Sequence, residues 1–142
     1  MKVILDANVF VSFLLTRSHT ISSIFKYWDE NRFALLVSDE ILEEYMLIFD
    51  KLLSKGYEIK KHEFDSLIKK VNKRAINIKI TSKLNLSSDK KDNRYINCAK
   101  DGKADYLVTG DKADLLNIGN YKYTQIISVS EFYANLKLLD YR

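Results

Sequence analysis

The 142-residue sequence has no proline, one cysteine and four glycines. The single cysteine, Cys98, excludes an internal disulfide and any metal site built from several cysteines, and it is typical of a protein of the reducing cytoplasm. No apolar run approaches the ~18 residues that cross a bilayer, so we expect no membrane partner. The first apolar run is interrupted by Asp6, and we therefore expect no signal peptide.

Composition is that of a globular protein, with 46% hydrophobic and 30% charged residues, which excludes a disordered chain. A chain of this length usually forms one domain, and no repeat, linker or low-complexity tract divides it. We therefore expect a single domain over residues 1–142. The net charge of +4 is a weak indication of a polyanionic partner, and it gains weight if several acids are gathered in one pocket.

Short apolar runs rich in β-branched residues predict buried parallel strands. They are residues 2–5, 33–37, 106–109 and 125–127, with a weaker candidate at 75–80. The intervals have apolar residues at helical spacing and predict helices at 9–15, 21–28, 38–53, 61–73 and 92–100, and a terminal one capped by Ser128 or Ser130. This alternation predicts an α/β fold, a three-layer α/β/α sandwich around a mainly parallel sheet of about five strands.

Acidic residues follow the predicted strands, at the carboxyl end of the sheet where such folds bind ligands. They are Asp6, Asp92, Asp111 and a group of three glutamates at positions 40, 43 and 44. Gathered carboxylates raise one another's pKa, so a fold that brings four together usually holds a cation. Oxygen ligands without His or Cys favour Mg²⁺ or Mn²⁺, and phosphoryl transfer is the chemistry of such sites. Each acid taken alone is better explained as a helix cap or a solvated residue, and it is their recurrence at strand ends that favours a metal site.

The second acid is selected by the helical periodicity after strand 33–37. A stripe of Ile41, Tyr45 and Phe49 defines the buried face of that helix. Glu44 lies nearest to the border of this face, whereas Glu40 and Glu43 point further into solvent. The periodicity favours Glu44 but separates it from Glu43 only modestly.

Four ordered strings carry a resemblance to a known family. They are VILDANVFVS at residues 3–12, SDEILEEY at 38–45, DKKDN at 89–93 and ADYLVTGD at 104–111. In order and spacing they resemble the PIN-domain family of metal-dependent ribonucleases, and most closely its VapC-like branch of toxins from toxin–antitoxin systems. That branch usually has proline where this chain has Asp39 and Lys90, both at turn positions.

The resemblance implies a set of functional residues. Asp6, Glu44, Asp92 and Asp111 are the implied catalytic, metal-binding acids. Asn8 and Thr109 are the implied polar supports, with Asp114 as a further member of the acidic cluster. The implied activity is hydrolysis of RNA by a water activated by Mg²⁺ or Mn²⁺, with no Ser or Cys nucleophile. The implied partners are an RNA substrate and an inhibitory antitoxin protein, and many members are homodimers.

Four basic residues lie beside the acids in the sequence, namely Lys90, Lys91, Arg94 and Lys112. They are candidates for contacts to RNA phosphates, although a solvated face of a lysine-rich protein gives the same pattern. Gly110 is expected to make a tight turn that aims Asp111 back over the strand ends.

Other functions remain as alternatives. A haloacid-dehalogenase-like phosphatase needs a second Asp where this chain has Asn8, and a receiver domain needs a Lys where the last strand leads into Ser128. A non-catalytic binding module with the same fold, and an RNA-processing nuclease outside toxin–antitoxin systems, stay open. Metal-dependent cleavage of RNA discriminates the catalytic alternatives from the binding module.

Overall fold

The computed structural model describes residues 1–16, 18–57, 60–110 and 113–141. Within these ranges the strands are β1 (Lys2–Leu5), β2 (Ala34–Val37), β3 (Ile76–Asn77), β4 (Tyr106–Thr109), β5 (Asn120–Tyr121) and β6 (Thr124–Ser128). The helices are α1 (Ala7–Thr16), α2 (His19–Asp29), α3 (Asp39–Ser54), α4 (Lys61–Arg74), α5 (Asn93–Gly102), α6 (Ala113–Leu116) and α7 (Val129–Leu138). Short 3₁₀ turns at Lys90–Asp92 and Leu139–Tyr141 precede α5 and follow α7.

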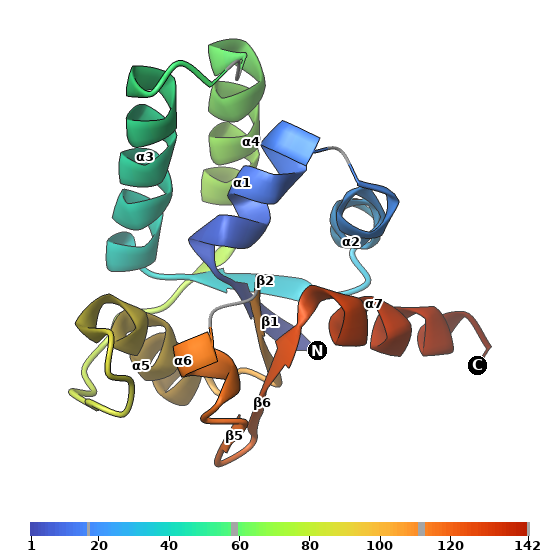
Figure 1. Cartoon of the computed structure of the whole chain (residues 1–142). Helices are drawn as coiled ribbons and strands as arrows, with labels where there is room; N and C mark the ends of the chain where they lie inside the picture. Colours follow the sequence, from blue (N-terminus) through green and yellow to red (C-terminus); the bar gives the residue numbers. More distant parts are fainter. Residues whose placement is uncertain (17, 58–59, 111–112, 142) are drawn as a thin grey trace.

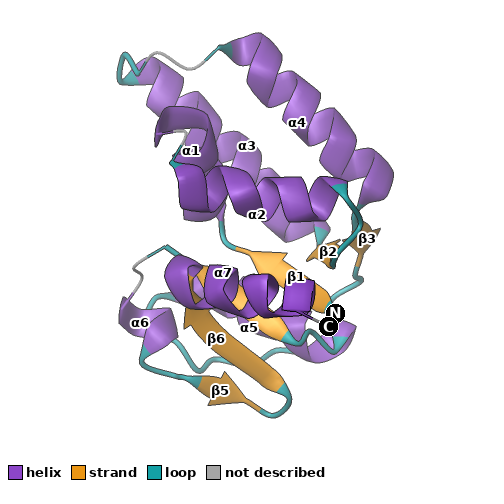
Figure 2. Cartoon of the chain, turned by 90° about the vertical axis from the view of Figure 1, so that its right-hand side faces the viewer, coloured by secondary structure: helices purple, strands orange, loops and turns teal. Residues whose placement is uncertain are grey.

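The strands form one sheet in the order β3-β2-β1-β4-β6-β5, parallel except for the antiparallel pair β5–β6. Helices α1 to α4 lie on one side of the sheet and α5 on the other, and α7 packs against α2 and β6 (Figures 1 and 2). This is the predicted three-layer α/β/α sandwich. In the described ranges no helix combines the length and apolar character that a membrane span requires.

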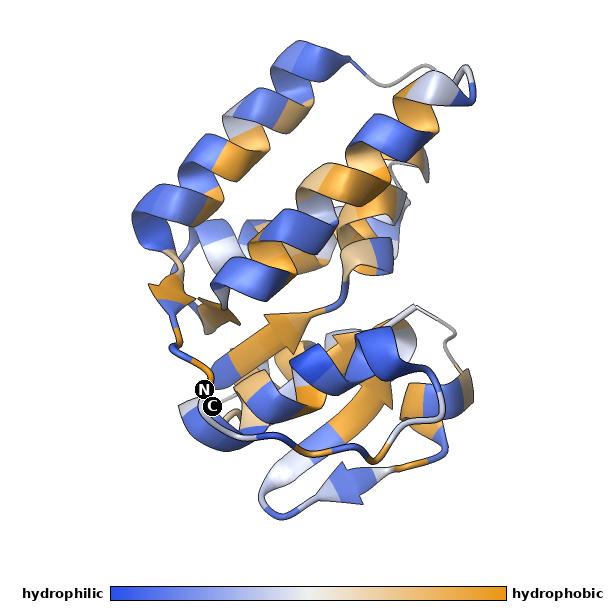
Figure 3. Cartoon of the chain, turned by 90° about the vertical axis from the view of Figure 1, so that its left-hand side faces the viewer, coloured by the Kyte–Doolittle hydropathy of each residue, from blue (hydrophilic) through white to orange (hydrophobic). Residues whose placement is uncertain are grey.

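The core lies on both faces of the central strands, which are hydrophobic along their lengths (Figure 3). The helices around them turn one hydrophobic side inward, and aromatic pairs join neighbouring helices. Phe10 of α1 packs on Tyr45 of α3 with ring centroids 4.2 Å apart. Phe49 of α3 stacks on Phe64 of α4 at 3.7 Å. These contacts fix α3 between α1 and α4, and α3 is the helix that carries Glu44.

The expected elements are largely confirmed, with differences at their ends. Strands 2–5 and 106–109 are found with the expected bounds, whereas the weak candidate at 75–80 shortens to Ile76–Asn77. Strand β5 and helix α6 were not expected, because two and four residues are too few to show a periodicity. Gly110 lies at a bend, but its φ is not positive, unlike those of Gly56 and Gly119, so this backbone conformation does not require glycine. The expected direction of Asp111 lies outside the described residues.

Serine residues cap two of the helices that follow strands, α3 and α7. Ser38 Oγ accepts a hydrogen bond from the backbone N–H of Ile41 at 3.2 Å, and Ser128, not Ser130, caps α7 in the same way. Asp39 and Lys90 each occupy the first position of a helical turn. That position has no intrahelical partner for its N–H, which is why it accepts proline in related chains and other residues here.

We predict that Ser38→Ala destabilises the protein by about 1 kcal/mol, because it leaves a buried N–H of α3 without an acceptor. Urea denaturation measures the change. Ser54→Ala, at the exposed C-terminal end of the same helix, is the matched control and is expected to stay within about 0.5 kcal/mol of the parent. Equal effects at the two ends would contradict the capping role.

Cys98 lies on α5, fully buried, as the sequence indicates. Burial raises the pKa of its thiol from 9.0 to about 12, with a further contribution from the negative charges of Asp101 and Glu40. The thiolate is the reactive form, so the folded protein holds this cysteine in an unreactive state at neutral pH.

We predict that Cys98 resists alkylation by iodoacetamide in the folded protein near pH ~8 and reacts readily in urea, because the native thiol stays protonated and enclosed. Mass spectrometry of timed samples measures the two rates. Similar rates in buffer and in urea would contradict the burial and the raised pKa.

Candidate active site

The centre of the site is the point at which the chain reverses direction across the sheet. From β1 the chain moves outward to β2 and β3, and it returns to the other side of β1 to form β4 and β6. Parallel sheets bind ligands at the carboxyl ends of the strands beside this switch point. Here the switch point lies between β1 and β4, whose last residues are followed by Asp6 and Gly110.

Asp6 bridges the two strands at this point. Its backbone N–H donates to the carbonyl oxygen of Val108 at 3.0 Å, and the hydroxyl of Thr109 donates to its Oδ2. Both Asp6 and Thr109 are fully buried. The predicted support residue Thr109 therefore holds one oxygen of the first predicted acid.

Asp6 also begins α1. Its Oδ1 accepts a hydrogen bond from the N–H of Val9 at 3.2 Å, so the carboxylate lies at the positive end of a helix, where negative charge is favoured. Asn8 follows in the first turn, half-buried. Its Cβ lies 3.6 Å from the place that a Cβ on Gly110 would occupy, so Asn8 borders the end of β4.

Glu44 lies in the second turn of α3 and is 7% exposed, whereas Glu40 and Glu43 are exposed. This agrees with the helical periodicity of the sequence. Arg94 of α5 is the neighbouring cation, with its Nη1 3.5 Å from Glu44 Oε2. That oxygen is buried and accepts no hydrogen bond from the part of the chain that the structure describes.

Asp92 lies at the end of the 3₁₀ turn that leads into α5, and it is 1% exposed. Its backbone N–H donates to the carbonyl oxygen of Asp89 at 3.0 Å. Asp89 itself is exposed, and its Oδ1 accepts from the N–H of Lys91 at 3.0 Å. Asp89 is therefore a capping residue, and Asp92 is the buried acid of this segment.

Two tyrosines that sequence reasoning treated as core aromatics hold the backbone on either side of Asp6. The hydroxyl of Tyr45 donates to the carbonyl oxygen of Leu5, and the N–H of Ala7 donates to the hydroxyl oxygen of Tyr95 at 3.0 Å. A signal for them existed in the sequence, because Tyr45 directly follows Glu44 and Tyr95 lies one helical turn after Asp92. Each tyrosine comes from the helix that carries an acid.

The pKa values of these two tyrosine hydroxyls also depend on the charges around them. Burial raises the pKa of Tyr45 well above that of an ordinary phenol, and the nearby carboxylates of Asp6 and Glu44 raise it further. Burial likewise raises the pKa of Tyr95, and Glu44 and Asp6 again contribute. The charges of Asp6 and Glu44 thus both raise the pKa of the same two tyrosines, although the two acids come from different elements.

Not every predicted residue can be located. Asp111 and Lys112 lie outside the described residues, and Asp114 is exposed in the first turn of α6. Lys90 and Lys91 are exposed and Arg94 is half-buried. Within the described ranges, no three His, Cys, Asp or Glu residues are grouped so that they could hold a metal ion on their own.

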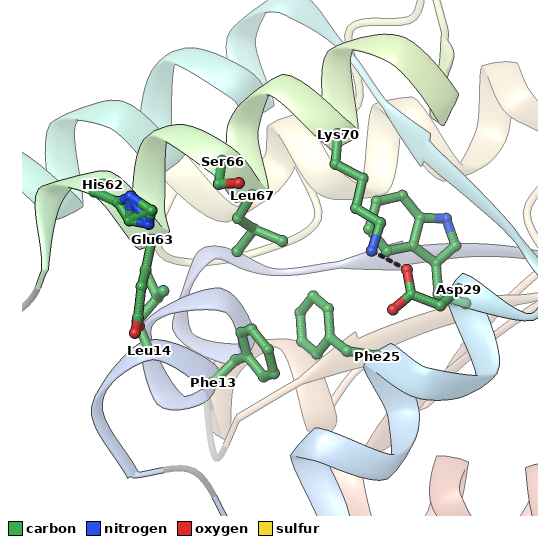
Figure 4. Close-up of a pocket in the computed structure, with 10 residues that line it drawn as sticks. Phe13, Leu14, Phe25, Asp29, His62, Glu63, Ser66, Leu67 and Lys70 are labelled. Atoms are coloured by element: carbon green, nitrogen blue, oxygen red, sulfur yellow. Dashed lines mark ion pairs between the residues drawn. The ribbon is translucent and has the colours of Figure 1, made fainter.

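A separate cavity of about 330 Å³ lies between α1, α2 and α4 (Figure 4). Phe13 and Phe25 stack at 4.2 Å within it, and the ammonium of Lys70 pairs with the carboxylate of Asp29 at its other end. Its described lining contains none of the acids or basic residues that the sequence singled out. The acids near the strand ends therefore define the candidate site, and this cavity does not belong to it.

We predict that Tyr95→Phe destabilises the protein by about 1–3 kcal/mol, because the buried N–H of Ala7 loses its acceptor. Urea denaturation measures the change. Tyr123→Phe, at an 85% exposed side chain, is the matched control and should have almost no effect. A Tyr95→Phe variant as stable as the control would show that the hydroxyl does not hold this backbone.

Comparison with known proteins agrees with this geometry. A family profile described as PIN domain matches residues 2–113, a range that contains β1 to β4 and every predicted site residue except Asp114. The comparison with curated proteins gave no match. PIN domains are generally nucleases, and they typically use divalent metal ions. With the profile covering most of its length, the chain belongs to the PIN domain family.

Proposed function

We propose that the protein is an endoribonuclease that depends on Mg²⁺ or Mn²⁺, with Asp6, Glu44, Asp92 and Asp111 as the acids that hold the cation. One observation carries the proposal. Three of these carboxylates are buried in a PIN fold, Asp6 at its switch point, and one of their oxygens, Glu44 Oε2, accepts no hydrogen bond from the described residues. Burying a polar oxygen unsatisfied costs free energy, which a ligand at that position recovers.

The donor set fits a small, hard divalent cation. It consists of carboxylate oxygens, which are the ligands that Mg²⁺ and Mn²⁺ prefer. Magnesium commonly takes one or two carboxylates and keeps several waters, so a cation does not need three acids of the described ranges at once. Asp111, directly after Gly110 at the end of β4, is the fourth proposed ligand and lies outside the described residues.

The residues of the candidate site have distinct roles in the proposed hydrolysis. When bound, the cation supplies the charge that activates a water and stabilises the leaving oxygen of a phosphodiester. Thr109 and the N–H of Val9 orient the carboxylate of Asp6, and Asn8 borders the end of β4. Burial of Glu44 and Asp92 limits their contact with bulk water, which strengthens the electrostatic effect of their carboxylates.

Basic residues beside the acids are proposed to bind the RNA. Lys90 and Lys91 are exposed on the 3₁₀ turn before Asp92, and Arg94 follows it by two residues. Lys112, which lies outside the described residues, is proposed as a fourth basic contact. Such contacts to phosphates position a strand without reading its sequence.

The biological role is proposed as the toxin of a toxin–antitoxin pair, a single domain of residues 1–142 with an antitoxin protein as inhibitor and a homodimer as its assembly. This part rests on the four sequence strings and their VapC-like pattern. A short reading frame overlapping the upstream end of the gene would support it, and growth arrest relieved by co-expression of that frame tests it. An RNA-processing nuclease would give cleavage without such relief.

We predict that Asp6→Asn abolishes RNA cleavage in Mg²⁺ or Mn²⁺ and leaves the fold intact. The amide keeps an oxygen for the N–H of Val9, and loss of one charge near Glu44 relieves repulsion. Cleavage of a labelled single-stranded RNA and thermal unfolding without metal measure the two properties.

Asp65→Asn, an exposed acid on α4, is the matched control and should cleave like the parent. EDTA should stop cleavage by the parent and the control alike. Cleavage that continues in EDTA would contradict the dependence on metal. An Asp6→Asn variant that loses stability in proportion to activity would make Asp6 a structural residue.

A further inference from the structure

A second cavity, of about 370 Å³, lies between α3 and α5. Leu47 and Ile80 form its apolar part, and Glu40 and Glu43 line it from the first two turns of α3. Its cations are Lys90 and Arg94. Arg94 also lies beside Glu44, one of the proposed metal ligands.

The amides of this cavity are already engaged. Asn93 Oδ1 accepts from the N–H of Ser87 at 2.8 Å, and Asn97 Oδ1 accepts from the N–H of Leu84 at 2.7 Å. These bonds tie α5 to the preceding loop and form a fixed wall. In the described lining, the charged donors that remain for an anion are therefore Lys90 and Arg94.

Arg94 stands between the cavity and the buried carboxylate. Its Nη1 donates to the backbone carbonyl oxygen of Glu40 at 3.2 Å and lies 3.5 Å from Glu44 Oε2. A guanidinium that is fully bonded to a carboxylate approaches to about 2.7–2.9 Å. Arg94 thus compensates the charge of Glu44 without a close hydrogen bond to its Oε2, so a cation that binds this oxygen more closely can replace Arg94.

We propose that Arg94 is a cation-gated phosphate-binding residue: it is the counter-ion of Glu44 in the metal-free protein, and a divalent cation at Glu44 releases it to bind an RNA backbone phosphate in the cavity between α3 and α5. The proposal rests on the proposed function, because it takes Glu44 as a metal ligand. It adds that metal and RNA are bound cooperatively, and it names the residue that couples them.

The coupling follows from competition for one carboxylate. The guanidinium and the cation cannot both neutralise Glu44 at short range, so binding of the cation frees the arginine at the cavity edge. By linkage, the factor by which the cation raises RNA affinity equals the factor by which RNA raises cation affinity. Lys90 lines the same cavity, but in the described structure the cation paired with Glu44 is Arg94, so the contribution of Lys90 should not depend on the metal ion.

The test is RNA binding by Arg94→Gln, measured by fluorescence anisotropy with a short labelled single-stranded RNA of mixed sequence, once in EDTA and once in Ca²⁺ to suppress cleavage. For the parent we expect Ca²⁺ to raise RNA affinity by about tenfold. For Arg94→Gln we expect near-parental affinity in EDTA and an increase of less than about twofold in Ca²⁺. Lys90→Gln should weaken binding equally in both media.

Lys100→Gln is the matched control, because it removes one exposed charge from the same helix, α5. It should keep the parental enhancement by Ca²⁺. A salt series adds a second readout, the slope of log RNA affinity against log salt concentration. Replacing Arg94 by Gln should reduce the size of this slope by about 0.7 in Ca²⁺ and leave it unchanged in EDTA. An Arg94→Gln variant that is weakened equally in both media would make Arg94 an ordinary phosphate contact and overturn the gating.

Thermal unfolding with Mn²⁺ separates this inference from the proposed function. Arg94→Gln leaves Glu44 without its counter-ion, so we expect a lower melting temperature without metal and a larger upward shift with Mn²⁺ than in the parent. No shift with Mn²⁺ in the parent or in any variant would contradict the metal site itself. A shift of equal size in parent and Arg94→Gln would contradict only the role of Arg94.

Where Arg94→Gln does not fold, Arg94→Lys replaces it. Lysine keeps a positive charge for Glu44 but lacks the planar fork that binds a phosphate through two donors. Its melting temperature should therefore be near that of the parent, and its enhancement by Ca²⁺ should fall by several-fold. An unchanged enhancement would overturn the proposal.

Discussion

Two tyrosine hydroxyls fix the backbone on either side of Asp6, and the relative positions of the acids depend on them. Tyr45 bonds the carbonyl of Leu5 and Tyr95 the N–H of Ala7, so the end of β1 is tied at once to α3 and to α5. Helix α3 carries Glu44, and Asp92 directly precedes α5. A strand end tied to two helices cannot shift without moving the acids that they bear. The geometry of the site thus depends on the hydrogen bonds that hold α3 and α5 against the end of β1.

Neighbouring hydrogen bonds and charges offset part of the electrostatic cost of burying Asp6 and Glu44. Asp6 lies at the start of α1 and receives bonds from Val9 and Thr109, while Glu44 faces the guanidinium of Arg94. Partial positive charge at a helix start offsets part of a carboxylate's charge, but less than a metal ion does. These contacts leave one oxygen of Glu44 whose bonding is incomplete among the described residues.

Much of this could be predicted from the sequence, because strands and acids are both encoded locally. Runs such as 2–5 and 106–109 are mostly apolar, which is typical of a buried strand, and the face of α3 that includes Glu44 follows from helical periodicity. The role of Tyr45 was not predictable in this way. Its position on an apolar stripe is explained by packing alone, and the acceptor of its hydroxyl is 40 residues away. Periodicity reports burial, but not which distant polar atom a buried side chain meets.

Both edges of the sheet are two residues long, β3 on one side and β5 on the other. An edge strand presents unpaired N–H and C=O groups, and its length sets how well a foreign strand can add to it. Edges this short give a second chain almost no ladder to extend. A dimer of this protein therefore has to be built from side chains on the helical faces, and its specificity would lie in shape and charge instead of in backbone pairing.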